Sequence, residues 1–347
     1  MGWGWPEAPP IRTPSPSETS SQGSGGPAPA ARVGQASRLS GPASPGLLGL
    51  GVTGEGVATE PREGRAGRGP VPLGEGRPVR LGVIDTHCHL TFPDFAGRVP
   101  AVLAEAARHG VDRCITISTT TENCLECLAL AERHPSVWCT AGVHPLYADQ
   151  GPHRWENLGR VIRAERCVAW GELGLDRHYA EPTFAEQRRV LDEQIAFILS
   201  TRRSAPLVAG KPVVVHCREA FDDLVPILRD SGLDASRVVF HCFTGTPDDA
   251  RRVLDVGAWI SFTGVLTYRN AAALREAAAL VPIDRVMVET DAPYLSPDPH
   301  RTVRPCEPWM ASVTARRLAE IKGVAWEEFH ARLNDNSRRF FGIGGPA

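Results

Sequence analysis

In this sequence, histidines and carboxylates follow several short apolar runs. Residues placed in this way could together form one metal centre. The segment Asp85-Thr-His-Cys-His places His87 and His89 two residues apart after the run Leu-Gly-Val-Ile. Four more groups follow later apolar runs: Glu172, His216, His241 and Asp291. Mixed imidazole and carboxylate ligands suit zinc, manganese or iron, whereas magnesium prefers oxygen and water. The chemistry that such a set would support is metal-assisted hydrolysis.

Each of these residues has a structural alternative. A single histidine at a strand end is more often a hydrogen-bonded structural residue than a ligand. The pair His87 and His89 is also weak evidence, because residues two apart in an extended segment face the same way by default. What indicates a metal centre is that the six histidines and carboxylates occur together, at the ends of several expected strands. Imidazoles and carboxylates that converge in a partly dry pocket would be costly without a cation.

The elements that must position these groups are predicted from residue 81 onward. Short β-branched runs alternate there with longer helical patterns, which is typical of βαβ units and a parallel sheet. Expected strands are 81–86, 113–118, 137–142, 167–171, 212–216, 237–241, 258–263 and 285–290. Helical patterns fill the gaps, for example at 99–109, 122–133, 184–200, 219–230, 247–256 and 307–322.

Eight such units favour an α/β fold of the (β/α)8 TIM-barrel type, whose usual size is roughly 250 residues. A doubly wound sheet would carry a Gly-rich phosphate turn after its first strand, where this chain has Asp-Thr-His-Cys-His instead. In a barrel, the carboxyl ends of all strands converge on one face. The six groups are therefore predicted to meet there.

Residues 1–80 differ in composition from the rest of the chain. They contain 17 of the 34 glycines and 13 of the 30 prolines, with few large apolar residues and no periodicity. Such a segment cannot bury enough apolar surface to order itself, so we predict a disordered low-complexity tail followed by one domain over 81–347. Two alternatives stay open: a tail that binds a partner, and a translation start near Val79 or Val83.

Composition narrows the classes of protein to which the chain can belong. Charged residues make up 22% and hydrophobic ones 42%, as in globular domains, and the net charge of -2 gives no global attraction to nucleic acid. A local basic groove is still compatible with that charge.

Nine irregularly spaced cysteines indicate reduced thiols, and Cys124-Leu-Glu-Cys127 falls in a helical pattern, which favours a structural role. No apolar run reaches the roughly 20 residues of a membrane span, so the cytoplasm is the expected location. We expect no membrane association, and no obligate protein partner is indicated.

The region from Gly82 to about Ile343 resembles the TatD family of metal-dependent hydrolases, which have amidohydrolase-like barrels. The resemblance is carried by the motifs at 85–89 (DTHCH), 141–145 (AGVHP), 171–176 (GELGLD), 212–218 (PVVVHCR), 241–245 (HCFTG) and 289–295 (ETDAPYL). Members of this family are best known as deoxyribonucleases that depend on magnesium or another divalent metal. The resemblance therefore implies hydrolysis of phosphodiester bonds, with a nucleic acid, first of all DNA, as substrate.

Carried over by position, the resemblance implies two divalent cations per chain, whether magnesium, manganese or zinc. One would be held by His87, His89, Glu172 and Asp291, and the other by Glu172, His216 and His241, with Glu172 bridging. Two such cations can polarise a phosphoryl oxygen and lower the pKa of water. Asp291 would also take a proton from the attacking water, so Glu172 and Asp291 are the expected catalytic residues.

Candidate substrate contacts are His144, Arg218, Arg301 and Arg304. His144 follows the third expected strand and would lie near the substrate by family resemblance, with a structural role as the alternative. Arg218 could meet a phosphate or pair with the acidic residues Glu219, Asp222 and Asp223. Relatives carry a basic segment that ends in Arg-Asn-Glu-Pro. This chain has the stretch His300 to Pro308 there, with Cys306 in place of Asn and with the final Glu-Pro retained. The segment 202–210 lengthens the connection before the fifth strand, on the face opposite the site.

Two other classes of function compete with a nuclease. A deaminase or amide hydrolase on the same scaffold commonly has a lysine after the fourth strand, where this chain has Glu172. A catalytically silent scaffold would be expected to have lost ligands, whereas this set is complete.

Overall fold

The computed structural model describes residues 82–344, and within this range eight parallel strands form a barrel. Neighbouring strands pair in chain order, each strand with the next. The strands are β1 (Val83–Cys88), β2 (Val111–Thr116), β3 (Val137–Ala141), β4 (Cys167–Asp176), β5 (Val213–Arg218), β6 (Val238–Phe240), β7 (Trp259–Phe262) and β8 (Val286–Val288). The predicted TIM-barrel architecture is confirmed.

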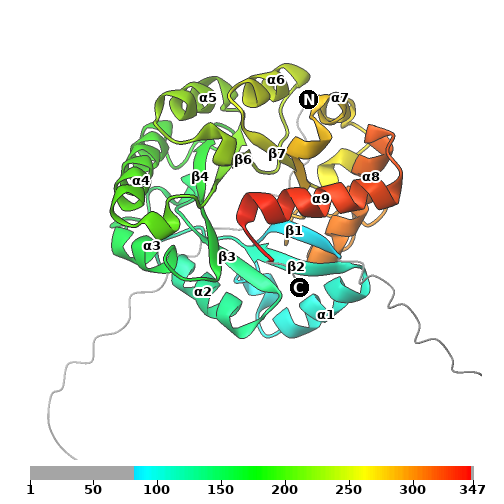
Figure 1. The fold of residues 1–347 in the computed structure, drawn as a ribbon, viewed down its shortest axis with the longest axis horizontal. Helices are drawn as coiled ribbons and strands as arrows, with labels where there is room; N and C mark the ends of the chain where they lie inside the picture. The colour runs from blue at the N-terminus through cyan, green and yellow to red at the C-terminus, as the bar shows by residue number, and fades with distance from the viewer. Residues whose placement is uncertain (1–81, 345–347) are drawn as a thin grey trace, which may run out of the picture. The chain divides into compact units, whose positions relative to one another are not determined.

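Helices surround the strands, and α9 lies across one end of the barrel (Figure 1). The helices are α1 (Val99–Arg108), α2 (Asn123–Arg133), α3 (Trp155–Val161), α4 (Phe184–Ser204), α5 (Phe221–Asp230), α6 (Pro247–Asp255), α7 (Ala272–Leu280), α8 (Ala311–Lys322) and α9 (Trp326–Phe341). Local sequence sets several of their ends. Thr183 and Thr246 form capping boxes at α4 and α6, whereas left-handed Gly323 and Gly342 end α8 and α9.

The alternation of side chains along the strands separates two cores. Ile84, Val214, Val239 and Met287 face the inside of the barrel, where the carboxyl end of α9 also packs through Phe340. The neighbouring strand residues face outward and join the larger core beneath the helices. The strands therefore bury apolar side chains on both faces, as expected for a parallel sheet covered by helices.

The barrel closes between β8 and β1 just beyond the last residue of β8. Cys88 and Ala292 form a parallel bridge there, and the backbone N–H of His89 donates to the carbonyl of Ala292 at 2.7 Å. The backbone N–H of Asp291 donates to the carbonyl of His87 at 2.9 Å. The hydrogen bonds that close the barrel therefore also fix the relative positions of three predicted metal-binding residues.

Some boundaries differ from the sequence predictions. Glu172 was expected to follow the fourth strand, but β4 continues past it to Asp176, because a register shift between Trp170 and Leu173 lets the strand resume its pairing with β5. The lengthened connection between α4 and β5 contains the 3-10 turn Pro206–Val208 and enters β5 at its amino end, as expected.

Other sequence predictions concern composition and location. Cys124 and Cys127 lie fully buried on α2, which agrees with a structural role. The predicted tail of residues 1–80 lies outside the described residues. Within the described part of the chain, no helix is long and apolar enough to cross a membrane.

The close pairing of β4 and β5 gives a prediction for stability. Gly174 has a φ of 148°, and a Cβ at this position would overlap the carbonyl oxygen of His216. We expect Gly174→Ala to lower the free energy of unfolding by about 2–4 kcal/mol, through backbone strain and steric overlap. Gly210→Ala is the matched control, because nothing lies within 4 Å of its added Cβ. Denaturant unfolding measures both, and equal stability of the two variants would contradict this account.

Candidate metal centre

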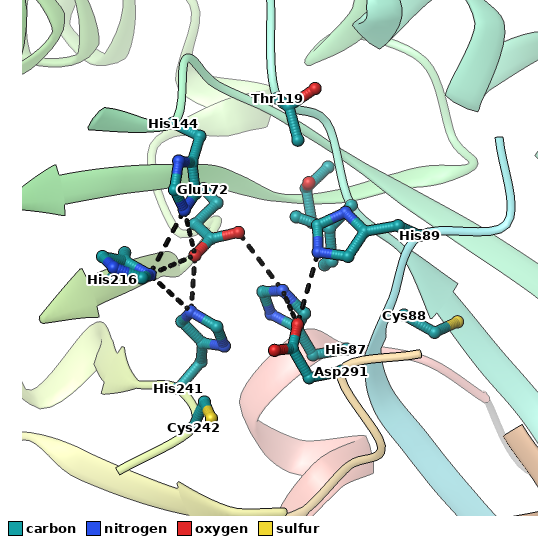
Figure 2. A network of polar contacts seen from close by, with 12 residues as sticks. His87, Cys88, His89, Thr119, His144, Glu172, His216, His241, Cys242 and Asp291 are labelled. Atoms are coloured by element: carbon teal, nitrogen blue, oxygen red, sulfur yellow. Dashed lines mark hydrogen bonds and ion pairs between the residues drawn. The ribbon is translucent and has the colours of Figure 1, made fainter. Parts of the chain in front are cut away.

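The six predicted metal-binding residues come together at the carboxyl ends of the strands (Figure 2). His87 and His89 extend from the end of β1 on either side of Cys88, whose thiol is directed away from the centre. The remaining members are Glu172 on β4, His216 on β5, His241 after β6 and Asp291 after β8. Their side chains form one continuous network of polar contacts.

Glu172 lies in the middle of this network and is fully buried. Its Oε1 atom is 2.5 Å from His241 Nε2, 3.0 Å from His216 Nδ1 and 3.4 Å from His144 Nε2. Its other oxygen, Oε2, is 3.2 Å from His87 Nε2. Figure 2 shows the carboxylate with three imidazoles on one side and His87 on the other. The carboxylate thus divides the centre into two halves: one oxygen faces His144, His216 and His241, and the other oxygen faces His87.

The bulge in β4 brings Glu172 to this position. Its backbone N–H leaves the β4–β5 ladder and donates instead to the carbonyl of Ser118, just after β2, at 3.2 Å. The approach of β3 to β4 is close, since a Cβ on Gly142 would come within 2.5 Å of the β4 backbone. A side chain at Gly142 would therefore push Glu172 away from its partners.

Asp291 completes the other half of the centre. Its Oδ1 atom is 3.3 Å from His89 Nε2 and 3.6 Å from His87 Nε2, and its side chain keeps 13% of its surface exposed. The backbone of Asp291 is left-handed, with a φ of 58°, a conformation that is unusual for a residue other than glycine. This local strain is consistent with a residue whose position serves function.

Burial and charge act against each other in the centre. Burial raises the pKa of Glu172, but the imidazoles of His241, His144 and His87 outweigh it and hold the pKa well below its ordinary value. The pKa of His241 is shifted in the opposite direction: burial lowers it, whereas Glu172 and Glu289 raise it well above the usual range. The centre therefore favours an ionised Glu172 carboxylate beside a protonated His241, whereas burial lowers the pKa of His87.

Two carboxylates behind the imidazoles were not predicted as site residues. Asp176 Oδ2 is 2.8 Å from His216 Nε2, and Glu289 Oε1 is 3.5 Å from His241 Nδ1. Burial raises the pKa of Asp176, but its hydrogen bond with His216 lowers it to about 2. Such carboxylates fix the tautomer and orientation of metal-binding imidazoles. Both residues lie within the motifs of the sequence, and their place behind a histidine becomes visible only in three dimensions.

The donor atoms fit divalent cations. Among the described residues, the buried atoms His87 Nδ1, His87 Nε2, His89 Nδ1, Glu172 Oε2 and His241 Nδ1 have no hydrogen-bond partner. Buried polar atoms are normally satisfied, so this concentration of unsatisfied imidazole and carboxylate atoms points to missing ligands. Three sets of side chains in the centre bring ligand atoms within 4.8 Å of one another: His87, His89 and Glu172; His87, His241 and Asp291; and His144, Glu172 and His216.

A fourth set with this spacing, formed by Asp85, Cys88 and Cys114, lies fully buried beside the centre. The carboxylate of Asp85 accepts hydrogen bonds from the backbone of His87 and from both the backbone and the hydroxyl of Thr290. Burial nevertheless raises the pKa of Asp85 to about 8. Asp85 thus joins the segments that carry His87 and Asp291, a positioning role that its place in the motif did not reveal.

The predicted substrate contacts lie at different depths. His144 belongs to the network itself, since its Nε2 atom is 3.2 Å from His216 Nδ1, and burial lowers its pKa to about 3. Arg218 is buried and lies over the ring of Tyr179 at 5.2 Å. The three acidic residues considered as its partners contact other groups: Glu219 pairs with His178, Asp222 with Arg252, and Asp223 with Arg177.

The segment after β8 carries the other two arginines. Arg301 lies over the ring of Tyr268 at 3.5 Å, whereas Arg304 is exposed and donates to the carbonyl of Val303. Cys306, the departure from the family pattern, is fully buried, with its Sγ atom 3.5 Å from Met310 Sδ. The cysteine therefore packs beneath this segment, whereas the two arginines remain partly or fully exposed.

Comparison with known proteins gives consistent matches over the described part of the chain. Residues 84–342 match the family described as TatD related DNase. The uncharacterized metal-dependent hydrolase YcfH of Escherichia coli K12 is 40% identical over 264 residues, which cover 75% of this chain and 96% of that protein. A protein of Enterobacter lignolyticus named 3'-5' ssDNA/RNA exonuclease TatD is 34% identical over 266 residues, 75% of this chain and 99% of its own.

A solved structure agrees with these matches. The crystal structure of YJJV, a TatD homologue of Escherichia coli K12, superposes with a TM-score of 0.68 at 31% identity. The superposition covers 76% of this chain and 98% of that one.

The carboxylate behind His216 gives a prediction for metal binding. We expect Asp176→Asn to weaken binding of Mn²⁺ or Zn²⁺ about tenfold or more, because the amide no longer fixes the imidazole in its binding orientation. Titration calorimetry of the metal-depleted protein measures the effect. Asp223→Asn is the control, since this carboxylate pairs with Arg177 on the same face but contacts no histidine of the centre. Unchanged affinity in Asp176→Asn would contradict the proposed positioning role.

Proposed function

The chain belongs to the TatD family of metal-dependent hydrolases, and we propose that it hydrolyses phosphodiester bonds in nucleic acid, with DNA as the first candidate substrate. The observation that carries this proposal is the buried carboxylate of Glu172, which faces imidazoles from both halves of the centre. The Enterobacter relative, named as an exonuclease of single-stranded DNA and RNA, supports this choice of substrate.

We assign two divalent cations to the centre, with Glu172 shared between them. His87, His89, Glu172 and Asp291 would hold one, and Glu172, His216 and His241 the other. When bound, such cations polarise a phosphoryl oxygen and lower the pKa of an attacking water. Four imidazoles in the two shells favour manganese or zinc over magnesium alone.

Asp291 is the proposed proton acceptor. Its carboxylate is the one in the centre that retains exposed surface, so a water at the mouth can reach it. Burial raises its pKa, but His89, His87 and His241 outweigh that effect and hold the pKa below its ordinary value, which keeps the carboxylate ionised. An ionised carboxylate at this position can both bind a cation and take the proton of the attacking water.

The substrate would be bound by groups outside the two shells. His144 follows β3, Arg218 is the last residue of β5, and Arg301 and Arg304 follow β8, all on the same face. Arginine can bind a phosphate through two N–H groups at once. With a net charge of -2, any attraction for a polyanion must come from such local groups.

We also propose that the protein works in a reducing compartment such as the cytoplasm. All nine cysteines are buried and free, although several lie close enough to one another to influence each other's pKa. Thiols in this state are typical of cytosolic proteins.

The proposed role of Asp291 predicts the effect of a single isosteric substitution. Asp291→Asn should lower kcat on a labelled single-stranded oligonucleotide by about 10²–10⁴-fold, because the amide cannot accept the proton. Asp298→Asn, on the same segment after β8, should cleave at the wild-type rate. Metal content of each variant shows whether the cations are still bound. Cleavage by Asp291→Asn at the wild-type rate would exclude this assignment.

Removal of the cations should affect both stability and activity. Dialysis against a chelator should abolish cleavage of DNA and RNA oligonucleotides and lower the melting temperature, because the folded state loses the free energy of cation binding. Re-addition of Mn²⁺, Zn²⁺ or Mg²⁺ should restore both. At a hundredfold excess over its Kd, a cation adds about 2.7 kcal/mol to the free energy of unfolding. A protein that binds these metals but cleaves neither DNA nor RNA would refute the proposed function.

A further inference from the structure

Aromatic residues recur at a constant distance from the residues of the centre. Four residues of the centre or of the carboxylates behind it are followed, three positions later, by an aromatic residue. These aromatic residues are Phe92, Tyr147, Tyr179 and Tyr294, which follow His89, His144, Asp176 and Asp291. We call the four aromatic side chains the aromatic rim.

The spacing has a structural cause. The backbone N–H of each rim residue turns back to the residue three positions earlier. Phe92, Tyr147 and Tyr294 donate to the carbonyls of His89, His144 and Asp291 at 3.0, 2.9 and 3.0 Å, and Tyr179 donates to the Asp176 carboxylate at 3.3 Å. Each such turn carries the chain outward from the strand end. The aromatic rim therefore lies one turn outside the metal centre.

The rim side chains are half-buried, so part of each ring remains open to a ligand. The ring of Phe92 stacks on His89, with centroids 4.6 Å apart, and Tyr294 meets Phe92 edge-on at 6.4 Å.

The distribution of tyrosine supports a binding role. All four tyrosines of the chain follow a strand on the carboxyl-end face: Tyr147, Tyr179, Tyr268 and Tyr294 follow β3, β4, β7 and β8. Tyr268, on which Arg301 lies, is a buried member of the larger core, whereas Tyr294 packs against that core with only part of its ring. Tyrosine combines an apolar ring with a polar tip and is frequent where one side of a residue meets a ligand.

We propose that the aromatic rim stacks against unpaired nucleobases on either side of the scissile phosphate, which makes single-stranded nucleic acid the bound form. This inference rests on the proposed function. Every base offers a π-face, so stacking gives affinity with little preference for sequence. In a duplex those faces are covered by neighbouring base pairs. Since the chain has a net charge of -2, stacking supplies binding energy that a strongly basic protein would draw from phosphate contacts.

Tyr294 provides the decisive test. The wild type, Tyr294→Leu and Tyr294→Phe are compared, with bound metal, on a single-stranded oligonucleotide and on the same strand with abasic sites flanking the cleaved bond. Tyr294→Leu should raise KM on the intact strand about tenfold, as expected for the loss of one stacked base, whereas Tyr294→Phe should remain within about twofold of the wild type. On the abasic strand the wild type and Tyr294→Leu should have similar KM values, because the interaction is already absent.

Controls separate stacking from general damage. Trp138→Leu removes an aromatic ring at the amino end of β3, on the opposite face, and should leave KM unchanged. Tyr179→Leu removes a ring after β4 and should raise KM on the intact strand but not on the abasic one. Equal KM values for the wild type, Tyr294→Leu and Tyr179→Leu on the intact strand would overturn the rim proposal, as would equally large effects on both strands. If the wild type cleaves neither strand, the proposed function itself fails.

Discussion

The centre depends on one buried carboxylate. Glu172 has almost no exposed surface, so its charge must be compensated by groups brought to it from other strands. Without cations, protons supply that charge: the pKa of Glu172 is lowered and that of His241 is raised, because the two groups stabilise each other's ionised forms. Protons and cations therefore compete for the same imidazole nitrogens. The bulge of β4 and the close approach of Gly142 follow from the need to hold this carboxylate at the meeting point of the strands.

A second constraint links the centre to the integrity of the barrel. The seam between β8 and β1 is formed by backbone hydrogen bonds of His87, His89 and Asp291, and the carboxylate of Asp85 crosses the same seam to Thr290. The residues proposed to bind cations and the residues that close the barrel are therefore the same or adjacent. A change that loosens the seam between β8 and β1 would therefore displace residues of the proposed cation sites. A bound cation would in return stabilise this seam.

The sequence predicted the barrel and the six candidate metal-binding residues because both depend on local patterns. Apolar runs mark the strands, and His87, His216 and Asp291 stand at their carboxyl ends, which the barrel topology brings together. The continuation of β4 past Glu172 was missed, because a bulge depends on pairing with β5 and leaves no periodic signal. Helix α9 lies beyond the last element expected, and its role in closing the barrel interior through Phe340 is a tertiary one.

Other roles could not be predicted from the sequence, because they depend on contacts between different elements. Asp176 and Glu289 are ordinary acidic residues until the fold places a histidine in front of each. His144 was expected near the substrate, and its contacts with Glu172 and His216 depend on how the turn after β3 packs over β4 and β5. Contacts between turns of different strands cannot be derived from spacing along one strand.

Hydrogen bonds between strands hold the metal centre, whereas turns and loops hold the groups around it. Cys306, where the chain departs from the family pattern, lies among the outer groups. The strands position the inner imidazoles and carboxylates through ladder hydrogen bonds, so their geometry tolerates little change. The outer groups stand on turns and loops, where sequence can vary without disturbing the ladder. Cys306 belongs to the outer segment, yet its thiol is buried against Met310, and its backbone N–H donates to Pro293. Cys306 therefore packs beneath the segment that carries Arg301 and Arg304. We expect this departure from the family pattern to act on substrate preference through the position of those arginines, and not on the proposed cation-binding groups of the strands.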